Sequence, residues 1–398
     1  MNNRFARQRG AMLVTASLFM IFLIGLAAVV VDVGHMMTAR NALQNAADAA
    51  ALAGASCLTR SSAPSGQDCT STPSASLNWA MAKTKAELTI RLNQVDGVSL
   101  VDGTVTTGYK NMAGTPANLQ AITLSPVGAY DKPAVWVQLR KAPGSNGGPL
   151  QMLMSNLYGG SGLSMTATAV AVISSPATVP PNSLIPYAIN QCMFNLYWDT
   201  ARNAPRLATL TSLKGVPQVL GQPWVFRIGS LDDDDDDDDH DDDCDSGQWS
   251  SFGSNDRKGG DEENDSKGEK NAKSSKALMS SGNASAVSIG DPIVIQPDPN
   301  TDFRSLAAQY PPGADVTLAV INQAKGLNAV GSTPVVGFAG FRITVIRDGS
   351  DGSQGGSDKS QGKSDQYIQG QFIQNTTTAG ASGVGAYFGT YTPPRLAQ

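Results

Sequence analysis

The 398-residue sequence contains only two histidines, His35 and His240, and charged residues make up only 16% of it. Histidine is the commonest acid–base catalyst near neutral pH, so few side chains are available for such chemistry. The sequence also lacks GxSxG, HExxH, Walker and dinucleotide-binding motifs, and it has no CxxC pair that would indicate zinc. We therefore expect no enzymatic activity, no cofactor and no metal site.

The longest uncharged apolar segment covers residues 11–31, and Arg4, Arg7 and Arg9 precede it. A helix of 21 residues spans about 32 Å, which matches a bilayer core of about 30 Å. The arginines favour a cytoplasmic N-terminus. A secretory signal is the competing interpretation, but its apolar region is usually shorter. We expect a single transmembrane helix in the inner (cytoplasmic) membrane, with lipid around it and the bulk of the chain periplasmic.

Asp32 follows the apolar run directly. Acids within membranes are costly and are usually functional. Its place at the outer boundary predicts an ordinary interfacial residue, and the alternative is pairing with a basic group on a partner helix.

The segment after the apolar run is rich in alanine and should continue the helix to about Ala55. Apolar and small residues recur in it with heptad spacing, and such a seam lets helices approach closely. The seam could pack on a partner helix or on the globular part of the same chain. Its residues, called the small-residue seam below, are Met36, Ala39, Leu43, Ala46, Ala50 and Ala53.

Four cysteines occur, an even number that predicts two disulfides in an exported chain. Three pairings are possible, and proximity along the chain favours Cys57 with Cys69 and Cys192 with Cys244. Residues 232–245 hold twelve aspartates, so the rest of the chain carries 29 − 22 = +7 against a net charge of −5. Self-repulsion predicts a solvated loop there, and weak, diffuse cation binding is the alternative.

The remaining pattern predicts an α+β fold: a long N-terminal helix followed by a β-rich exported region with long disordered loops. One further helix is expected at 77–95, and strands at 121–124, 134–139, 165–174, 184–189, 286–295, 337–346 and 366–372. The expected divisions are a cytoplasmic 1–10, a membrane span 11–31, a helix extension 32–57, an α+β region 58–175, and a β-rich region 176–398 with a low-complexity insertion at 230–285.

The N-terminal segment resembles the TadE/TadG-like proteins of the tight-adherence (Flp) pilus system. The matching elements are Arg9-Gly10, the exit Val31-Asp32-Val33-Gly34, and the stretch LQNAADAAALA from Leu43 to Ala53. Segments around 185–192, 290–294 and 336–372 look more weakly like the C-terminal part of Tad-like proteins. Processing after Gly10 by a prepilin peptidase prefers glutamate five residues on, and this chain has Thr15 there.

The resemblance implies a membrane-anchored, pseudopilin-like component of pilus assembly or surface adherence that has no enzymatic activity. Its partners would be other Tad/Flp assembly proteins or pilins, contacted through the N-terminal helix, and not nucleic acid. The alternative is an anchored surface binding module whose acidic loop binds cations or matrix.

Overall fold

A computed structural model provides the fold of the chain. It describes residues 4–154, 162–200, 202–213, 215–229, 249–253, 282–296, 303–322, 331–348 and 366–397. The aspartate run 232–245, with His240 and Cys244, lies outside the described residues, as does most of the loop expected between the last two long strands.

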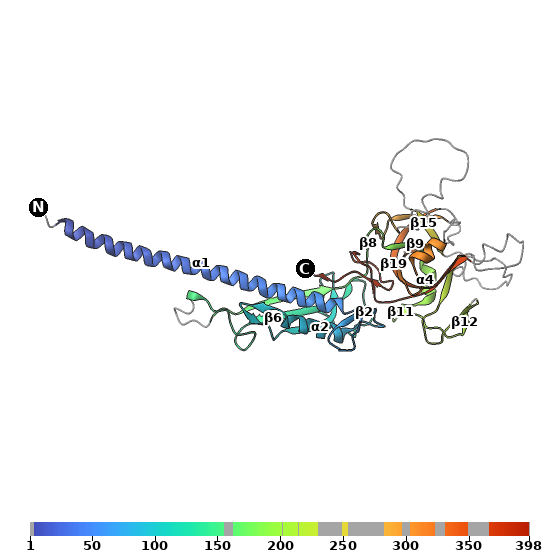
Figure 1. Cartoon of the computed structure of the whole chain (residues 1–398), viewed down its shortest axis with the longest axis horizontal. Helices are drawn as coiled ribbons and strands as arrows, with labels where there is room; N and C mark the ends of the chain where they lie inside the picture. Colours follow the sequence, from blue (N-terminus) through green and yellow to red (C-terminus); the bar gives the residue numbers. More distant parts are fainter. Residues whose placement is uncertain are drawn as a thin grey trace, which may run out of the picture.

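One helix dominates the molecule. α1 (Arg4–Ser56) is 53 residues long and projects far from the rest of the chain at its N-terminal end (Figure 1). At 1.5 Å per residue it is about 80 Å long. Its first half meets the length and composition needed to cross a membrane, and its second half lies along the globular part. The long helix expected from the sequence is confirmed.

The first globular region packs α1 on a second helix and a sheet. α2 (Trp79–Arg91) and the strands β5 (Thr104–Asn111), β6 (Asp131–Lys141) and β7 (Met165–Val172) form it. The strands are antiparallel, in the order β23-β7-β6-β5. β7 alternates valine, alanine and threonine, and its buried alanines share a core with the alanines of α1. β23 (Arg395–Leu396) pairs with β7, so the last described strand of the chain returns to the first sheet.

The second region is a seven-stranded sheet in the order β14-β20-β19-β17-β15-β9-β18. A further pairing of β18 with β19 closes five of these strands into a ring. Aromatic side chains fill one face, with Phe194 and Phe372 rings 4.9 Å apart. The elements are β9 (Leu184–Asn190), α4 (Gln191–Tyr197), β14 (Phe226–Gly229), β15 (Trp249–Gly253), β17 (Pro292–Gln296), α6 (Phe303–Gln309), β18 (Asp315–Ile321), β19 (Gly331–Asp348) and β20 (Gln366–Phe372).

Short strand pairs connect these elements. The pairs are β1 (Arg60–Ser62) with β2 (Cys69–Pro73), β3 (Gln94–Val95) with β4 (Val98–Ser99), β8 (Thr178–Val179) with β16 (Val287–Ser288), β10 (Trp198–Asp199) with β11 (Ala204–Pro205), β12 (Ser212–Leu213) with β13 (Val216–Pro217), and β21 (Thr376–Thr377) with β22 (Thr390–Tyr391). The fold as a whole is α+β, as the sequence predicts.

The strand expected at 121–124 is wrong. This segment forms a turn in which the N–H of Leu124 donates to the carbonyl of Ala121 at 3.1 Å. Only Gln120 makes an isolated bridge, to Tyr109. Pro126 follows closely and has no N–H with which to extend a ladder. The strand pair expected near the C-terminus is confirmed, because β19 and β20 are antiparallel partners.

Candidate functional site

The N-terminal half of α1 presents bare apolar surface. Each side chain from Met12 to Val31 is exposed or half-exposed, and Met12 is 76% exposed. Twenty residues of helix cover about 30 Å, the thickness of a bilayer core. An apolar surface of this size needs lipid or another protein to cover it. This half of α1 is therefore a candidate interaction surface.

Asp32 follows the bare segment and makes hydrogen bonds that the sequence did not indicate. Its side chain is buried, and its two carboxylate oxygens accept the backbone N–H groups of Leu153 at 2.7 Å and Met154 at 2.8 Å. Charge-assisted bonds of this kind satisfy the carboxylate within the chain. Asp32 keeps the boundary position that the sequence predicts, but its carboxylate is already bonded within the chain. The alternative of pairing with a basic group on a partner helix is therefore corrected.

One turn further on, His35 contacts the β3–β4 hairpin. Its Nε2 lies 2.8 Å from Oδ1 of Asp96, and both side chains are about one-third exposed. Asp96 and Gly97 form the hairpin turn with φ of +57° and +70°, which suits an Asp-Gly pair. His35 thus ties α1 to the hairpin.

The small-residue seam faces the chain's own globular part. Ala39, Leu43, Ala46 and Ala50 are at most 3% exposed, and they share a core with residues of α2, β6 and β7. Met36 and Ala53 are half-buried. The sequence allowed the seam to pack on a partner helix or on the globular part of the same chain. In the structure it packs on the globular part. The seam is therefore not available to a partner helix in this conformation.

A second face of α1 beyond Asp32 remains uncovered. Exposed Met37 and Arg40 lie at one edge of this face, and the residues along its middle are small or polar. We call this middle part the outer stripe, and it consists of Gly34, Thr38, Asn41, Asn45 and Ala49, all of which are exposed. Their spacing of three or four residues places them on one side of the helix, so the outer stripe extends the bare surface of the first half.

A disulfide fixes the chain where α1 ends. Cys57 and Cys69 are bonded to each other, and Cys57 is fully buried. Asp68 beside them accepts a hydrogen bond from Lys85 at 2.8 Å, and this bond lowers the pKa of Asp68. Since the two sulfurs are joined, they offer no thiolate to a metal. Cys192 is also disulfide-bonded, and its predicted partner Cys244 lies outside the described residues.

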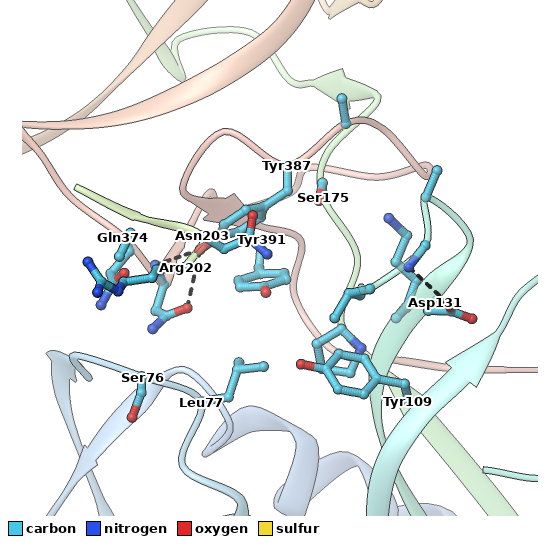
Figure 2. Close-up of a pocket in the computed structure, with 18 of the residues that line it drawn as sticks. Ser76, Leu77, Tyr109, Asp131, Ser175, Arg202, Asn203, Gln374, Tyr387 and Tyr391 are labelled. Carbon is cyan, nitrogen blue, oxygen red and sulfur yellow. Dashed lines mark hydrogen bonds between the residues drawn. The ribbon is translucent and has the colours of Figure 1, made fainter. Parts of the chain in front are cut away.

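A cleft of about 690 Å³ lies where the two regions meet (Figure 2). It is lined by parts of the first region and by the C-terminal segment, including Lys132, Tyr387 and Tyr391. Lys132 is buried and donates to the carbonyl of Gly385 at 3.4 Å, and burial lowers the pKa of its amine to about 8. Burial also raises the pKa values of Tyr387 and Tyr391.

Several polar groups that line the cleft form hydrogen bonds within the fold. Asp131, the one acid among its lining residues, accepts bonds from Asn111, Gln120 and the N–H of Gly128. Nearby, Asn375 donates to the carbonyl of Ser74, which joins the two regions. The lining residues include no histidine or cysteine. Hydrogen bonds beside the cleft join the two regions. Its lining residues do not place a nucleophilic side chain next to a histidine or carboxylate base.

Comparison with known families identifies one similarity, which falls on α1. Residues 10–56 match the TadE/G-like Flp pilus-assembly family model. The match covers 56 − 10 + 1 = 47 of 398 residues and ends with α1 at Ser56. It does not extend to the weaker resemblances further along the chain. No curated protein and no solved structure matches the chain significantly. The Tad-like part of this molecule is therefore α1 itself.

Proposed function

We propose that this chain is a membrane-anchored, pseudopilin-like component of a Tad/Flp-type pilus-assembly system. The observation that carries the proposal is the coincidence of the family match with α1, the one described helix able to cross a membrane. In this role the protein acts by contacts with other proteins and catalyses no reaction.

The proposed location is the inner membrane, with the N-terminus in the cytoplasm. Arg4, Arg7 and Arg9 precede the span without a compensating acid, which supports this orientation. The Cys57–Cys69 disulfide supports an extracytoplasmic, oxidising compartment for the residues that follow.

The proposed contact surface is the bare face of α1. Pilins or other Tad/Flp assembly proteins would pack on the exposed apolar side chains of the span and on the outer stripe. The small residues Gly34 and Ala49 of the outer stripe support helix–helix contact, because they allow close approach. The small-residue seam is already buried on α2 and β7, so the partner uses the opposite face.

Deletion of the gene, followed by complementation in the same bacterium, tests this role. We expect deletion to abolish Flp pili and surface attachment, and the wild-type gene to restore both. Asn45→Trp should fail to restore them while the protein remains at its normal level, because a bulky ring blocks the outer stripe. Lys83→Trp, at an exposed position of α2, should restore them. Normal piliation in the deletion strain would refute the proposal.

A further inference from the structure

The connection between β6 and β7 reaches back along α1 to the end of the apolar run. Residues 142–164 contain no charged side chain. The structure describes residues 142–154 and 162–164 of this connection, and we call Gln151, Met152, Leu153 and Met154 the foot. Leu153 is 60% exposed, although its backbone is held by the Asp32 carboxylate. The foot thus presents an exposed apolar side chain from a fixed position.

The height of the foot along α1 follows from its hydrogen bonds. Asp32 comes directly after Val31, the last residue of the bare apolar segment, and the N–H of Leu153 lies 2.7 Å from Oδ1 of Asp32. A helix rises only 1.5 Å per residue, so Leu153 lies level with the outermost turn of the segment that would cross the bilayer. A flat bilayer around α1 would have its interface at this level.

The neighbouring groups are compatible with lipid contact. The acid nearest the foot, Asp32, is satisfied by backbone N–H groups, and Asp96 on the adjacent hairpin is paired with His35. The hairpin packs on the connection, since a Cβ placed on Gly147 would lie 2.7 Å from Val98. Val98 is itself 37% exposed. Val98 and Leu153 therefore face outward here, while Asp32 is buried and the partly exposed Asp96 is paired with His35.

We propose that the foot inserts Leu153 into the outer interface of the bilayer that α1 crosses, and that hydrogen bonds to the Asp32 carboxylate hold the foot in this position. The proposal rests on the membrane span of the proposed function. Its partner is lipid, because the exposed side chain continues the lipid-facing surface of α1 at the same level. A second point of attachment beside the helix restrains the tilt and rotation of α1, and so sets the direction in which the outer stripe faces.

Lipid quenching of a label on the foot tests this contact. The full chain carrying Leu153→Cys is labelled with an environment-sensitive NBD probe and reconstituted into phosphatidylcholine–phosphatidylglycerol vesicles. We expect blue-shifted emission and quenching by phosphatidylcholine that bears a nitroxide near its headgroup. Leu210→Cys is the matched control, since Leu210 is 59% exposed and lies next to β12, far from α1 (Figure 1). The unsubstituted chain gives the background of labelling at native cysteines.

A third label distinguishes failure of the foot contact from failure of the proposal that α1 crosses the membrane. Leu23→Cys lies within the bare segment and should be quenched by nitroxides placed deep in the acyl chains. Quenching at Leu23 with none at Leu153 would overturn the foot contact and leave the span standing. Absence of quenching at both positions would overturn both proposals.

A further variant tests whether Asp32 holds the foot in place. Adding Asp32→Ala to the Leu153 label should reduce headgroup-nitroxide quenching at Leu153, because the two backbone N–H groups lose their acceptor. Quenching at Leu23 should not change. If quenching at Leu153 were unchanged by Asp32→Ala, the proposal that Asp32 holds the foot in place would be wrong.

Discussion

Gly54 brings α1 so close to α2 that a Cβ placed on it would lie 2.7 Å from the carbonyl oxygen of Ala82. The same atom would lie 3.1 Å from Val135 of β6. Gly54 faces Ala82 and Ala86 of α2, and these small residues let the two helices approach closely. The anchor and the first region are consequently one packed unit.

Gly54→Ala should destabilise that unit. The added methyl group meets backbone that cannot rotate away, and overpacking of this kind costs about 1–3 kcal/mol. Gly34→Ala is the matched control, because nothing lies within 4 Å of a Cβ there and alanine favours a helix over glycine. Urea unfolding of the full chain in detergent micelles measures both. Equal stability of Gly54→Ala and Gly34→Ala would contradict the packing described.

Loss of the Cys57–Cys69 disulfide should lower the free energy of unfolding by about 3 kcal/mol in the chain-entropy account of a short loop. The two cysteines are 12 residues apart in the sequence. The double variant Cys57→Ser with Cys69→Ser is compared with wild type by thermal denaturation, which leaves the disulfide of Cys192 intact. Asp68→Asn, in the same loop, should have a much smaller effect. A double variant as stable as wild type would contradict this expectation.

Asp32→Ala should destabilise the docking of the foot. It leaves the N–H groups of Leu153 and Met154 without their acceptor, at a cost of about 2–3 kcal/mol. Asp48→Ala is the control, since Asp48 accepts one bond from Gln44 within the same helix and is only half-buried. Hydrogen exchange of the Leu153 and Met154 amides should accelerate in Asp32→Ala and stay slow in Asp48→Ala. Slow exchange in both variants would show that Asp32 does not hold the foot.

Buried Lys132 should make stability depend on pH. Burial lowers its pKa from 10.5 to about 8 in the folded chain, so between these values the unfolded chain binds more protons. Unfolding free energy therefore rises with pH from about 8 to 10.5, and the penalty of burying the charged amine is fully present below pH 8. The difference of 10.5 − 8 = 2.5 in pKa corresponds to about 3 kcal/mol.

Comparison with Lys132→Met isolates this effect. Tyr387 and Tyr391 titrate at high pH with the opposite sign, but both proteins contain them. Wild type should gain stability relative to Lys132→Met as the pH rises from 8 to 10. A difference that stays constant across this range would show that Lys132 keeps an ordinary pKa.

The sequence predicts the parts of the fold that depend on local pattern. The 21-residue apolar run and the alanine-rich segment after it indicate α1, and alternating β-branched residues locate β6, β7, β19 and β20. The helix expected at 77–95 is found in part as α2, which ends at Arg91, and residues 94–95 form β3 instead. Asn78 caps the first turn of α2 by accepting the N–H of Met81. Short-range spacing indicates these elements, whereas the strand expected from local pattern at 121–124 is a turn in the structure.

Contacts between distant segments could not be predicted in this way. The bonds from Leu153 and Met154 to Asp32 join residues more than 120 positions apart, and no spacing rule links them. The seam likewise could not be assigned to a partner helix or to the chain itself, because alanine spacing is the same in both cases. The outer stripe can be identified only from the structure, because the burial of the seam determines which face of α1 stays exposed.

Photo-crosslinking from the outer stripe tests the central claim most directly. A benzophenone amino acid replaces Asn45 in the full chain, expressed in the bacterium that carries the gene, and Lys83 on α2 serves as the matched exposed control. The account predicts adducts with a Flp pilin or another Tad/Flp assembly protein from position 45, identified by mass spectrometry, and none from position 83. Position 45 giving no such adduct, while the chain remains in the membrane fraction, would contradict it.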